Sequence, residues 1–389
     1  MNLIYHHRTR GTGVEAVHIL GIVRAFERRG WSVRVLSPPG VDLEGREPGG
    51  ATATSRPSRR LWQAISEHTP QLAFECLELG YNLHARRRLS RALQATPVDL
   101  IYDRYALFDW APVSVARRHR VPIVLEVNDA TVITRTRPLV ARRVAERIER
   151  WSFQHATRLV TITERFKALV VERHRIAPDR VVVLPNAVDP DRFALDEGHP
   201  VPGSHRPFII GMVGAYVPWH GVGFLLDTIH PFLTRTGARL VLVGDGPERA
   251  VIEERVRRYG LTQGVELTGF VPPCEVPRCL QRMDVCVLPH SNEHGSPMKI
   301  FEYMASGKPV LAPALPGVRD IITHQVDGWL FQPLDGASLA AGLDALHRNP
   351  ELRARLGQAA RATVLDKHTW DHRAEALLRA LEIAPPAPA

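Results

Sequence analysis

Short runs rich in β-branched residues alternate with longer amphipathic runs along most of this 389-residue chain. The longer run at 14–29 is of the helical type, because Ile19, Ile22 and Phe26 recur at helical spacing and Gly30 follows as a C-terminal glycine. The short runs of the first half are predicted to be buried parallel strands, at residues 3–5, 33–36, 100–102, 123–127, 159–162 and 181–184. This alternation predicts an open parallel sheet with helices on both faces.

The alternation stops once and then restarts. A stretch rich in Pro, Gly and His at 198–207 precedes a second set of predicted strands, at 208–213, 240–243, 265–267, 285–288 and 310–311. We therefore predict two Rossmann-like, doubly wound α/β domains, at 1–195 and 207–365, joined by a linker at 196–206. Residues 366–389 are predicted to form a helix that crosses back to the N-terminal domain, followed by a tail. Ligands of such sheets bind at the carboxyl ends of the strands, so we expect the two domains to face a central cleft.

Charge and composition limit the class of function. The chain carries 50 basic and 41 acidic side chains, a net charge of +9, and nearly all the basic residues are Arg. No nucleic-acid-binding motif accompanies them, so an anionic substrate or an acidic membrane surface is the better expectation. The 4 cysteines lack the spacing of a disulfide framework or a metal site. The sequence shows neither a signal peptide nor an apolar run of about 18 residues, and we expect a cytoplasmic protein.

The segment at 296–302 is predicted to bind an anion. Ser296 as N-cap and Pro297 as the first helical residue would start a helix directly after a strand, which leaves backbone N–H groups at Met298 and Lys299 free. The positive helix end and the Lys299 ammonium suit a diphosphate. Glu302 lies about one turn further, where a carboxylate can accept hydrogen bonds from a ribose diol. The alternative is that Glu302 only caps or pairs on an exposed helix face.

The residues from Glu302 to Val310, EYMASGKPV, resemble the C-terminal signature of glycosyltransferase family 4, the retaining nucleotide-sugar enzymes of GT-B fold. Further segments resemble motifs of that family in the same order: LPNAVD with a following Phe at 184–193, VGDGP at 243–247 and the stretch 317–328. The N-terminal half matches more loosely, through Gly11-Thr-Gly13 and His18. The resemblance implies transfer of a sugar from a nucleotide-diphosphate sugar to a hydroxyl acceptor, with no cofactor. The acceptor would be a glycan, a lipid-linked molecule or a small natural product.

The resemblance also implies a set of donor-binding residues: Gly214, His220, Gly244, Gly246, Val271, Gly295, Ser296, Met298, Lys299 and Glu302. The family's Glu-x7-Glu pair is interrupted, because His294 occupies its first position, so we expect a different contact with the transferred sugar. Ala215 and His220 stand where the family usually has Arg and Lys, so Lys299 is expected to supply the fixed charge at the diphosphate. The neutral imidazole of His220 can still donate one hydrogen bond there. The catalytic candidates are His294, Lys299 and Asp129.

Polar residues near the predicted strand ends of the N-terminal half are expected to contact the acceptor: Gly13, His6, His7, Arg104, Asn128 and Asp129. A structural role for any single histidine among them is the alternative. The sequence Asp189-Pro-Asp191 matches the Asp-x-Asp metal motif of other glycosyltransferases. Its position in the hinge segment favours a metal-independent enzyme, in which a helix dipole and cations replace Mg²⁺.

Two further features of the sequence, the basic clusters and a Gly- and Pro-rich stretch, each allow two interpretations. Basic residues gather at 86–91 and at 135–150, where Leu139, Val140, Val144 and Ile148 are interleaved with them. They form either a solvated face over a core stripe or a peripheral contact with the anionic inner face of the plasma membrane. The Gly- and Pro-rich stretch 38–60 is either a loop over the cleft or an insertion.

The sequence leaves some functions other than a transferase open and disfavours one. A nucleotide-sugar epimerase of related fold and a catalytically degenerate partner subunit are the alternatives that the substitutions at 215, 220 and 294 leave open. A nicotinamide-dependent dehydrogenase is disfavoured, because no Gly-x-Gly-x-x-Gly turn follows the first strand of either half.

Overall fold

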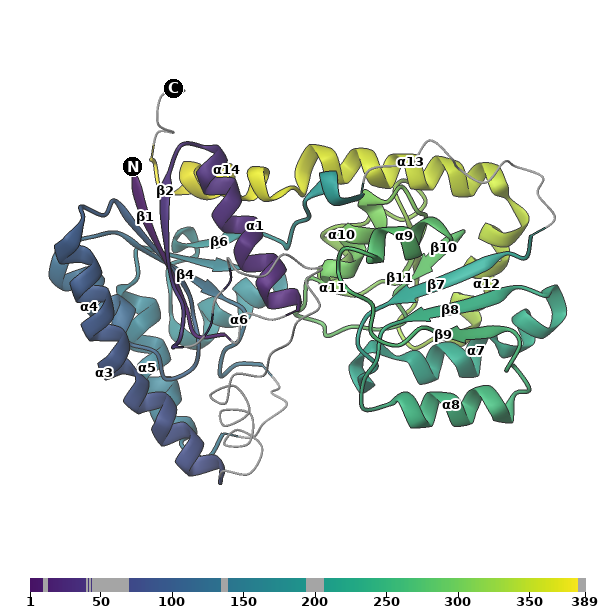
Figure 1. The fold of residues 1–389 in the computed structure, drawn as a ribbon, viewed down its shortest axis with the longest axis horizontal. Coiled ribbons are helices and arrows are strands. Elements are labelled where there is room, and N and C mark those ends of the chain that lie inside the picture. The colour runs from purple at the N-terminus through teal and green to yellow at the C-terminus, as the bar shows by residue number, and fades with distance from the viewer. Residues whose placement is uncertain are drawn as a thin grey trace. The chain divides into compact units, whose positions relative to one another are not determined.

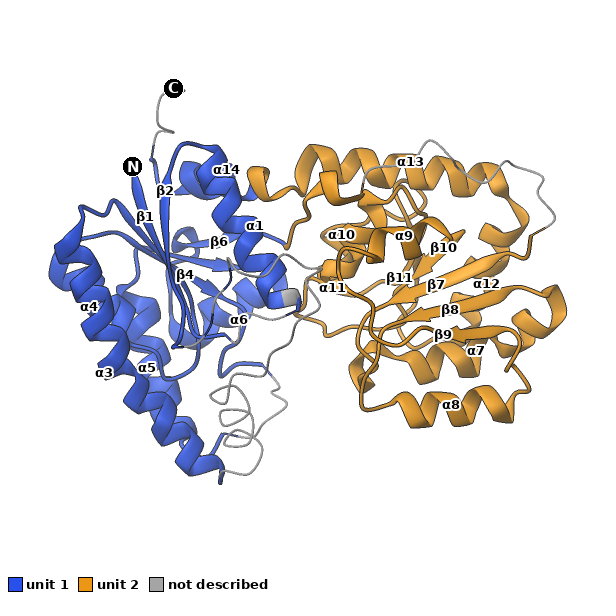
Figure 2. Ribbon diagram, in the orientation of Figure 1, with its two compact units in different colours: residues 1–185, 373–389 blue, residues 186–372 orange. Residues whose placement is uncertain are grey.

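The protein is described by a computed structural model that covers residues 1–9, 13–39, 41, 43, 70–133, 139–193 and 206–383. The chain divides into two compact units, which are described separately (Figure 2). Unit 1 comprises residues 1–185 and 373–389, and unit 2 comprises residues 186–372. Several predicted features lie outside the described residues: Gly11, most of the 38–60 stretch, Arg135, Arg137, the linker residues 196–205 and the tail from residue 384.

Unit 1 is built on a parallel sheet of six strands in the order β2-β1-β3-β4-β5-β6. The strands are β1 (Asn2–His7), β2 (Ser32–Leu36), β3 (Leu100–Arg104), β4 (Ile123–Val127), β5 (Arg158–Thr161) and β6 (Val181–Val183). The helices are α1 (Val14–Arg28), α3 (Gln71–Ala95), α4 (Ala111–His119), α5 (Arg142–His155), α6 (Glu164–His174) and α14 (Trp370–Ala380), with a 3₁₀ turn at Pro178–Arg180. They cover both faces of the sheet (Figure 1). Near one edge, Arg29 after α1 pairs with Glu375 of α14 at 3.3 Å.

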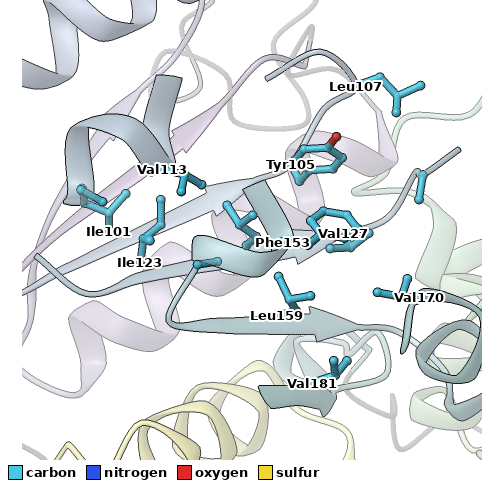
Figure 3. Close-up of a cluster of buried hydrophobic side chains, with 14 of the residues drawn as sticks. Ile101, Tyr105, Leu107, Val113, Ile123, Val127, Phe153, Leu159, Val170 and Val181 are labelled. Atoms are coloured by element: carbon cyan, nitrogen blue, oxygen red, sulfur yellow. The ribbon is translucent and has the colours of Figure 1, made fainter. Parts of the chain in front are cut away.

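The core of unit 1 lies where α4 and α5 pack on the strands. Ile101, Ile123 and Leu159 come from neighbouring strands and meet Val113 of α4 and Phe153 of α5 (Figure 3). Every residue of β4 is buried, as expected for a strand covered on both faces. The run of β4 in the sequence is apolar except for Glu126, which is typical of a central strand with one paired polar group.

Unit 2 repeats this architecture, with strand order β12-β11-β10-β7-β8-β9. Its strands are β7 (Ile209–Val213), β8 (Arg239–Val243), β9 (Val265–Leu267), β10 (Val285–Val287), β11 (Val310–Pro313) and β12 (Trp329–Phe331). Its helices are α7 (Val222–Thr236), α8 (Arg249–Arg258), α9 (Val276–Gln281), α10 (Met298–Ala305), α11 (Pro316–Arg319), α12 (Gly336–Arg348) and α13 (Pro350–Lys367), with 3₁₀ turns at Pro190–Phe193 and Pro218–His220. One apolar cluster lies under α10 and α13, and a second lies under α7, α8 and α12.

Both sheets confirm the predicted fold class of two parallel, doubly wound α/β domains. Strand β12 was missed, because three residues are too few to show a period in the sequence. In each unit the first strand has neighbours on both sides, so the strand order reverses between β1 and β3 and between β7 and β10. Ligands of such sheets bind beyond the carboxyl ends of the strands at this reversal. No helix in the described part of the chain is long and apolar enough to cross a membrane.

Candidate functional site

Three glycines follow the strands at the reversal point of unit 2, and a side chain at any of them would be crowded or strained. Gly214 directly follows β7 with φ 146°, and a Cβ there would lie 2.8 Å from the Nζ atom of Lys299. Gly244 directly follows β8 with φ 138°, and its Cβ would run into the Gly214 carbonyl. A side chain at Gly246 would meet the Tyr216 carbonyl at 2.5 Å. These glycines let two strand ends approach each other closely and leave room for the Lys299 ammonium.

Lys299 places a buried ammonium at this point. Its Nζ atom is buried and has no hydrogen-bond partner among the described residues. Burial lowers the pKa of Lys299 to about 7, with nearby Glu302 acting in the opposite direction. A buried cation without a partner is costly, so the arrangement is suited to an anion that arrives from outside.

Helix α10 carries Lys299 and is fixed to the end of β7 by Tyr303. The Tyr303 hydroxyl accepts a hydrogen bond from the Val213 N–H at 2.8 Å and donates one to the Val213 carbonyl at 3.3 Å. Tyr303 is fully buried. This double contact places the first turn of α10, and with it Lys299, beside Gly214.

The prediction that Ser296 caps this helix is wrong. The helix begins at Met298 with Pro297 in the cap position, and no side chain caps it. The Ser296 hydroxyl instead accepts the Asn186 N–H at 3.0 Å, and the Asn186 amide donates to the Ser296 carbonyl at 2.6 Å. Ser296 therefore ties the chain that enters unit 2 to the start of α10. The first-turn N–H groups lack a side-chain cap, which keeps the positive helix end suited to an anion.

Glu302 lies one turn beyond Lys299 on the same face of α10. Burial raises the pKa of Glu302 to about 7, although Arg192 and Lys299 both act to lower it. The side chain is only half-buried by exposed area, so it stays within reach of a ligand. A carboxylate in this position can accept two hydrogen bonds from a diol.

The His220 ring uses its Nδ1–H group within the protein. Its Nδ1 lies 2.6 Å from the Ala215 carbonyl, so the ring must donate its proton there. Burial and the Lys299 charge lower the pKa of His220 to about 4, which makes the ring neutral. The single donor of the neutral imidazole is thus occupied, and its other nitrogen is an acceptor. A hydrogen bond from His220 to a phosphate would therefore need a second proton, on Nε2, and the donor contact of His220 stays a prediction.

The remaining predicted donor residues lie on the loops around these groups. The Gly269 carbonyl, two residues before Val271, accepts the Gly244 N–H at 3.0 Å. His294 and Gly295 are half-buried in the loop before α10. Sequence reasoning missed two neighbours: His290, whose buried Nδ1 has no partner among the described residues, and Phe270, which is 77% exposed. Both residues closely follow a predicted strand, and this position was the signal in the sequence that could have identified them.

In unit 1 the polar groups at the strand ends converge on Glu126. This fully buried carboxylate of β4 accepts hydrogen bonds at 3.0 Å from Tyr102, from Asn128 and from Arg373. It also lies 2.5 Å from His18 Nε2 and 3.5 Å from Arg104. Burial acts to raise the pKa of Glu126, but His18, Arg373 and Arg104 outweigh burial and hold that pKa well below its usual range.

The predicted acceptor residues thus fall into two groups. Arg104 and Asn128 belong to the Glu126 network, whereas His6 and His7 lie inside β1, not after it, and are buried. His7 Nε2 contacts the Ser37 hydroxyl at 2.9 Å. Gly13, with φ 61°, precedes α1, and Asp129 is half-buried after β4. Sequence reasoning missed Arg373 as a member of this network, because it lies 247 residues further along the chain.

The basic residues of α5 form an exposed face. Arg142, Arg143, Arg147 and Arg150 are exposed, and so are Val140 and Val144. Leu139 and Ile148 pack instead against the core of unit 1. The apolar residues between the arginines are therefore divided between core and surface, and a contact of this face with anionic lipid stays a prediction.

Two family models together match most of the chain. The model described as Glycosyltransferase Family 4 matches residues 13–192, and the model described as Glycosyl transferases group 1 matches residues 207–349. Each unit is thus matched by one model.

Individual relatives agree with the family models. An uncharacterized glycosyltransferase of Methanocaldococcus jannaschii is 26% identical over 98% of this chain and 97% of its own. The 2-deoxystreptamine glucosyltransferase of Streptomyces kanamyceticus is 32% identical over 53% of this chain and 57% of its own.

Solved structures share the fold over the whole chain. Anabaena HepE in complex with UDP has a TM-score of 0.72 at 16% identity and covers 98% of this chain and 100% of its own. A sucrose-phosphate synthase from Thermosynechococcus elongatus has a TM-score of 0.71 at 17% identity and covers 98% of each chain.

Proposed function

This chain belongs to the group 1, family 4 glycosyltransferases, and we propose that it transfers a hexose, with retention of anomeric configuration, from a nucleotide-diphosphate sugar to a hydroxyl acceptor. The observation that carries the proposal is the buried Lys299 ammonium without a partner among the described residues, held at the strand reversal of unit 2. Gly214 lies next to this ammonium, since a Cβ at Gly214 would come within 2.8 Å of the Lys299 Nζ atom.

The main catalytic task in this proposal is to stabilise the leaving diphosphate. Lys299 and the first-turn N–H groups of α10 act on the negative charge that develops as the glycosidic bond breaks. Glu302 accepts hydrogen bonds from the ribose diol and so fixes the nucleoside. The leaving diphosphate then helps to take the proton of the attacking hydroxyl on the same face of the sugar, which accounts for retention without an enzymic nucleophile.

We place acceptor binding in unit 1. Its support is the concentration of polar side chains at the carboxyl ends of β1, β3 and β4, where Arg104, Asn128 and Asp129 lie. Glu126 holds Arg104 and Asn128 in fixed orientation, as a binding surface for a polyhydroxylated ligand requires.

A panel of nucleotide-diphosphate sugars, each offered with hydroxyl acceptors, tests the proposal. The expected result is a glycosylated product whose mass exceeds that of the acceptor by one hexose residue. An altered donor without transfer would identify an epimerase, and donor binding without turnover on any acceptor would identify a degenerate subunit.

Donor preference is expected to depend on His294. The imidazole offers one donor and one acceptor to the sugar, whereas a carboxylate offers acceptors only. His294→Glu should redistribute kcat/KM among donors that differ in the sugar by about tenfold, the size of one hydrogen bond. Affinity for the shared nucleoside diphosphate should change less than about twofold, because Lys299 and Glu302 are untouched. A uniform loss across all sugars would mean that His294 only shapes the loop.

Binding of nucleoside diphosphate to unit 2 is expected to need no divalent cation. Lys299 already supplies buried positive charge, and the Asp189 carboxylate is engaged with the Asp191 N–H at 3.3 Å. Titration in EDTA and in Mg²⁺ should therefore give affinities within about twofold of each other. Affinity that appears only with Mg²⁺, and disappears again in Asp191→Asn, would contradict this expectation.

A further inference from the structure

A second cluster of ionisable side chains lies in unit 1 and has no part in the proposed transfer. His6 of β1, Asp103 of β3 and Asp109 before α4 are each at most 2% exposed. His6 Nδ1 lies 2.5 Å from Asp103 Oδ1. One possible ligand atom from each of the three side chains, a nitrogen or an oxygen, lies within 4.8 Å of the other two.

The cluster is not satisfied by its surroundings. His6 Nε2 and both carboxylate oxygens of Asp109 are buried and have no hydrogen-bond partner among the described residues. Each such atom costs the protein its full desolvation energy, and a carboxylate costs more than a neutral group. Two nearly buried carboxylates with one imidazole therefore need a positive charge that the side chains do not fully supply.

Hydrogen bonds to the backbone at Asp109 and its neighbours hold this residue in place. The Asn82 side chain accepts the N–H groups of Trp110 and Ala111 at 2.9 Å each and donates to the Phe108 carbonyl at 2.8 Å. The Ser152 hydroxyl donates to the Asp109 carbonyl at 3.1 Å. These contacts keep the Asp109 carboxylate beside His6 and Asp103, so the cluster is a preformed constellation on rigid elements.

We propose that His6, Asp103 and Asp109 bind a divalent transition-metal ion of the Zn²⁺ class. One imidazole and two carboxylates are ligands that Zn²⁺ accepts, and two negative charges balance its charge. Ligand atoms around a tetrahedral zinc ion lie about 3.4 Å apart. Side-chain rotations that move the ligand atoms by less than about 2 Å would bring the three groups to that spacing. Metal binding replaces the proton that His6 and Asp103 share, since a ligating imidazole is neutral.

The chemistry of the cluster also selects among cations. Ca²⁺ takes six or more oxygen ligands and Mg²⁺ keeps several waters, whereas these buried side chains offer three ligand atoms, one of them nitrogen.

The nearby Arg8 guanidinium donates to the Leu107 carbonyl at 3.2 Å and lies 3.9 Å from Glu78. Burial raises the pKa of Asp109 to about 6 and the Arg8 charge acts to lower it, but the Asp109 carboxylate oxygens accept no hydrogen bond from Arg8. A bound ion would join the ends of β1 and β3 to the start of α4 and stabilise unit 1.

Metal content and thermal stability test the proposal on the full chain. Protein stripped with a strong chelator and then incubated with Zn²⁺ should retain about one equivalent after desalting, by elemental analysis. Its Tm should rise by several degrees, because an ion that binds the folded state stabilises it by mass action. The same concentration of Mg²⁺ should leave Tm unchanged. Co²⁺ should give the visible absorption of a tetrahedral site.

A matched pair of variants locates the ion. Asp109→Asn keeps the shape of the side chain and removes a ligand charge, and it should abolish both the retained Zn²⁺ and the rise in Tm. Asp99→Asn removes an exposed carboxylate from the same unit, where it accepts the Asn2 N–H at 2.6 Å, and should behave as the parent. The proposal is overturned if the parent retains no Zn²⁺ and shows no rise in Tm, or if Asp109→Asn retains Zn²⁺ equally. The parent measurements decide the matter even if Asp109→Asn fails to fold.

Discussion

Replacing Lys299 with methionine is expected to lower the affinity for nucleoside diphosphate by at least about 100-fold, the cost of removing a buried charged partner. Methionine fills much of the same volume, so the packing beside Gly214 should be kept. Affinity for the nucleoside without phosphates should change less than about twofold, because in the proposed complex the ammonium contacts only the diphosphate. Calorimetric titration of both ligands measures the two effects.

Lys367→Met is the matched control for this experiment. Lys367 ends α13 in an exposed position, so its replacement removes the same net charge from unit 2 without touching the site. Affinities for both ligands should equal those of the parent. An equal loss of nucleoside and nucleoside diphosphate in Lys299→Met would show that Lys299 supports the fold instead of the phosphate.

The pH dependence of binding gives an independent measure of the same charge. Burial lowers the pKa of Lys299 to about 7 in the free protein, and a bound anion would raise it again. Below pH 7 the ammonium is already charged, so affinity should not change through this group. Above pH 7 binding must take up a proton, and affinity should fall by up to about tenfold per pH unit. In Lys299→Met this fall should vanish, while the titration of the ligand itself remains.

The strands were predictable because buried parallel strands appear in the sequence as short, mostly apolar runs. The bounds of β4 and β9 agree with their predicted runs, and most others differ by one or two residues at an end. Strand β12 lacked this signal, since Trp329–Phe331 is too short to show a pattern. The Gly214 and Gly244 turns were likewise predictable, because only glycine fits a strand end at positive φ that another backbone approaches.

The polar partners were not predictable from spacing. Ser296 has the ideal residue type for a helix cap, yet a segment 110 residues earlier in the chain takes its hydroxyl. Glu126 and Arg373 are separated by 247 residues and meet because α14 packs on unit 1. Pairings of this kind depend on the tertiary fold, and local sequence propensity carries no information about them. The same holds for His6, Asp103 and Asp109, which come together only when β1 and β3 are neighbours.

Replacing Glu302 with alanine is expected to lower kcat/KM by about 30-fold or more. This corresponds to about 2 kcal/mol of transition-state stabilisation, the range for hydrogen bonds to a charged acceptor. The physical reason is that Glu302 lies one turn beyond Lys299, where its carboxylate is proposed to accept hydrogen bonds from the ribose. Steady-state kinetics with the preferred donor measures the loss.

A change in the ligand separates a ribose contact from a structural role of Glu302. The parent should bind a 2′,3′-dideoxynucleoside diphosphate about 30-fold more weakly than the ribose form, because the carboxylate then has no hydroxyl to accept from. Glu302→Ala should bind the two forms equally, since the contact is already lost. If the variant still preferred the ribose form by the full factor, another residue would hold the diol. Burial raises the pKa of Glu302 to about 7, so the parent's preference should weaken as pH falls below 7 and the carboxylate takes up a proton. A preference that ignored pH in the parent would also argue against a carboxylate contact.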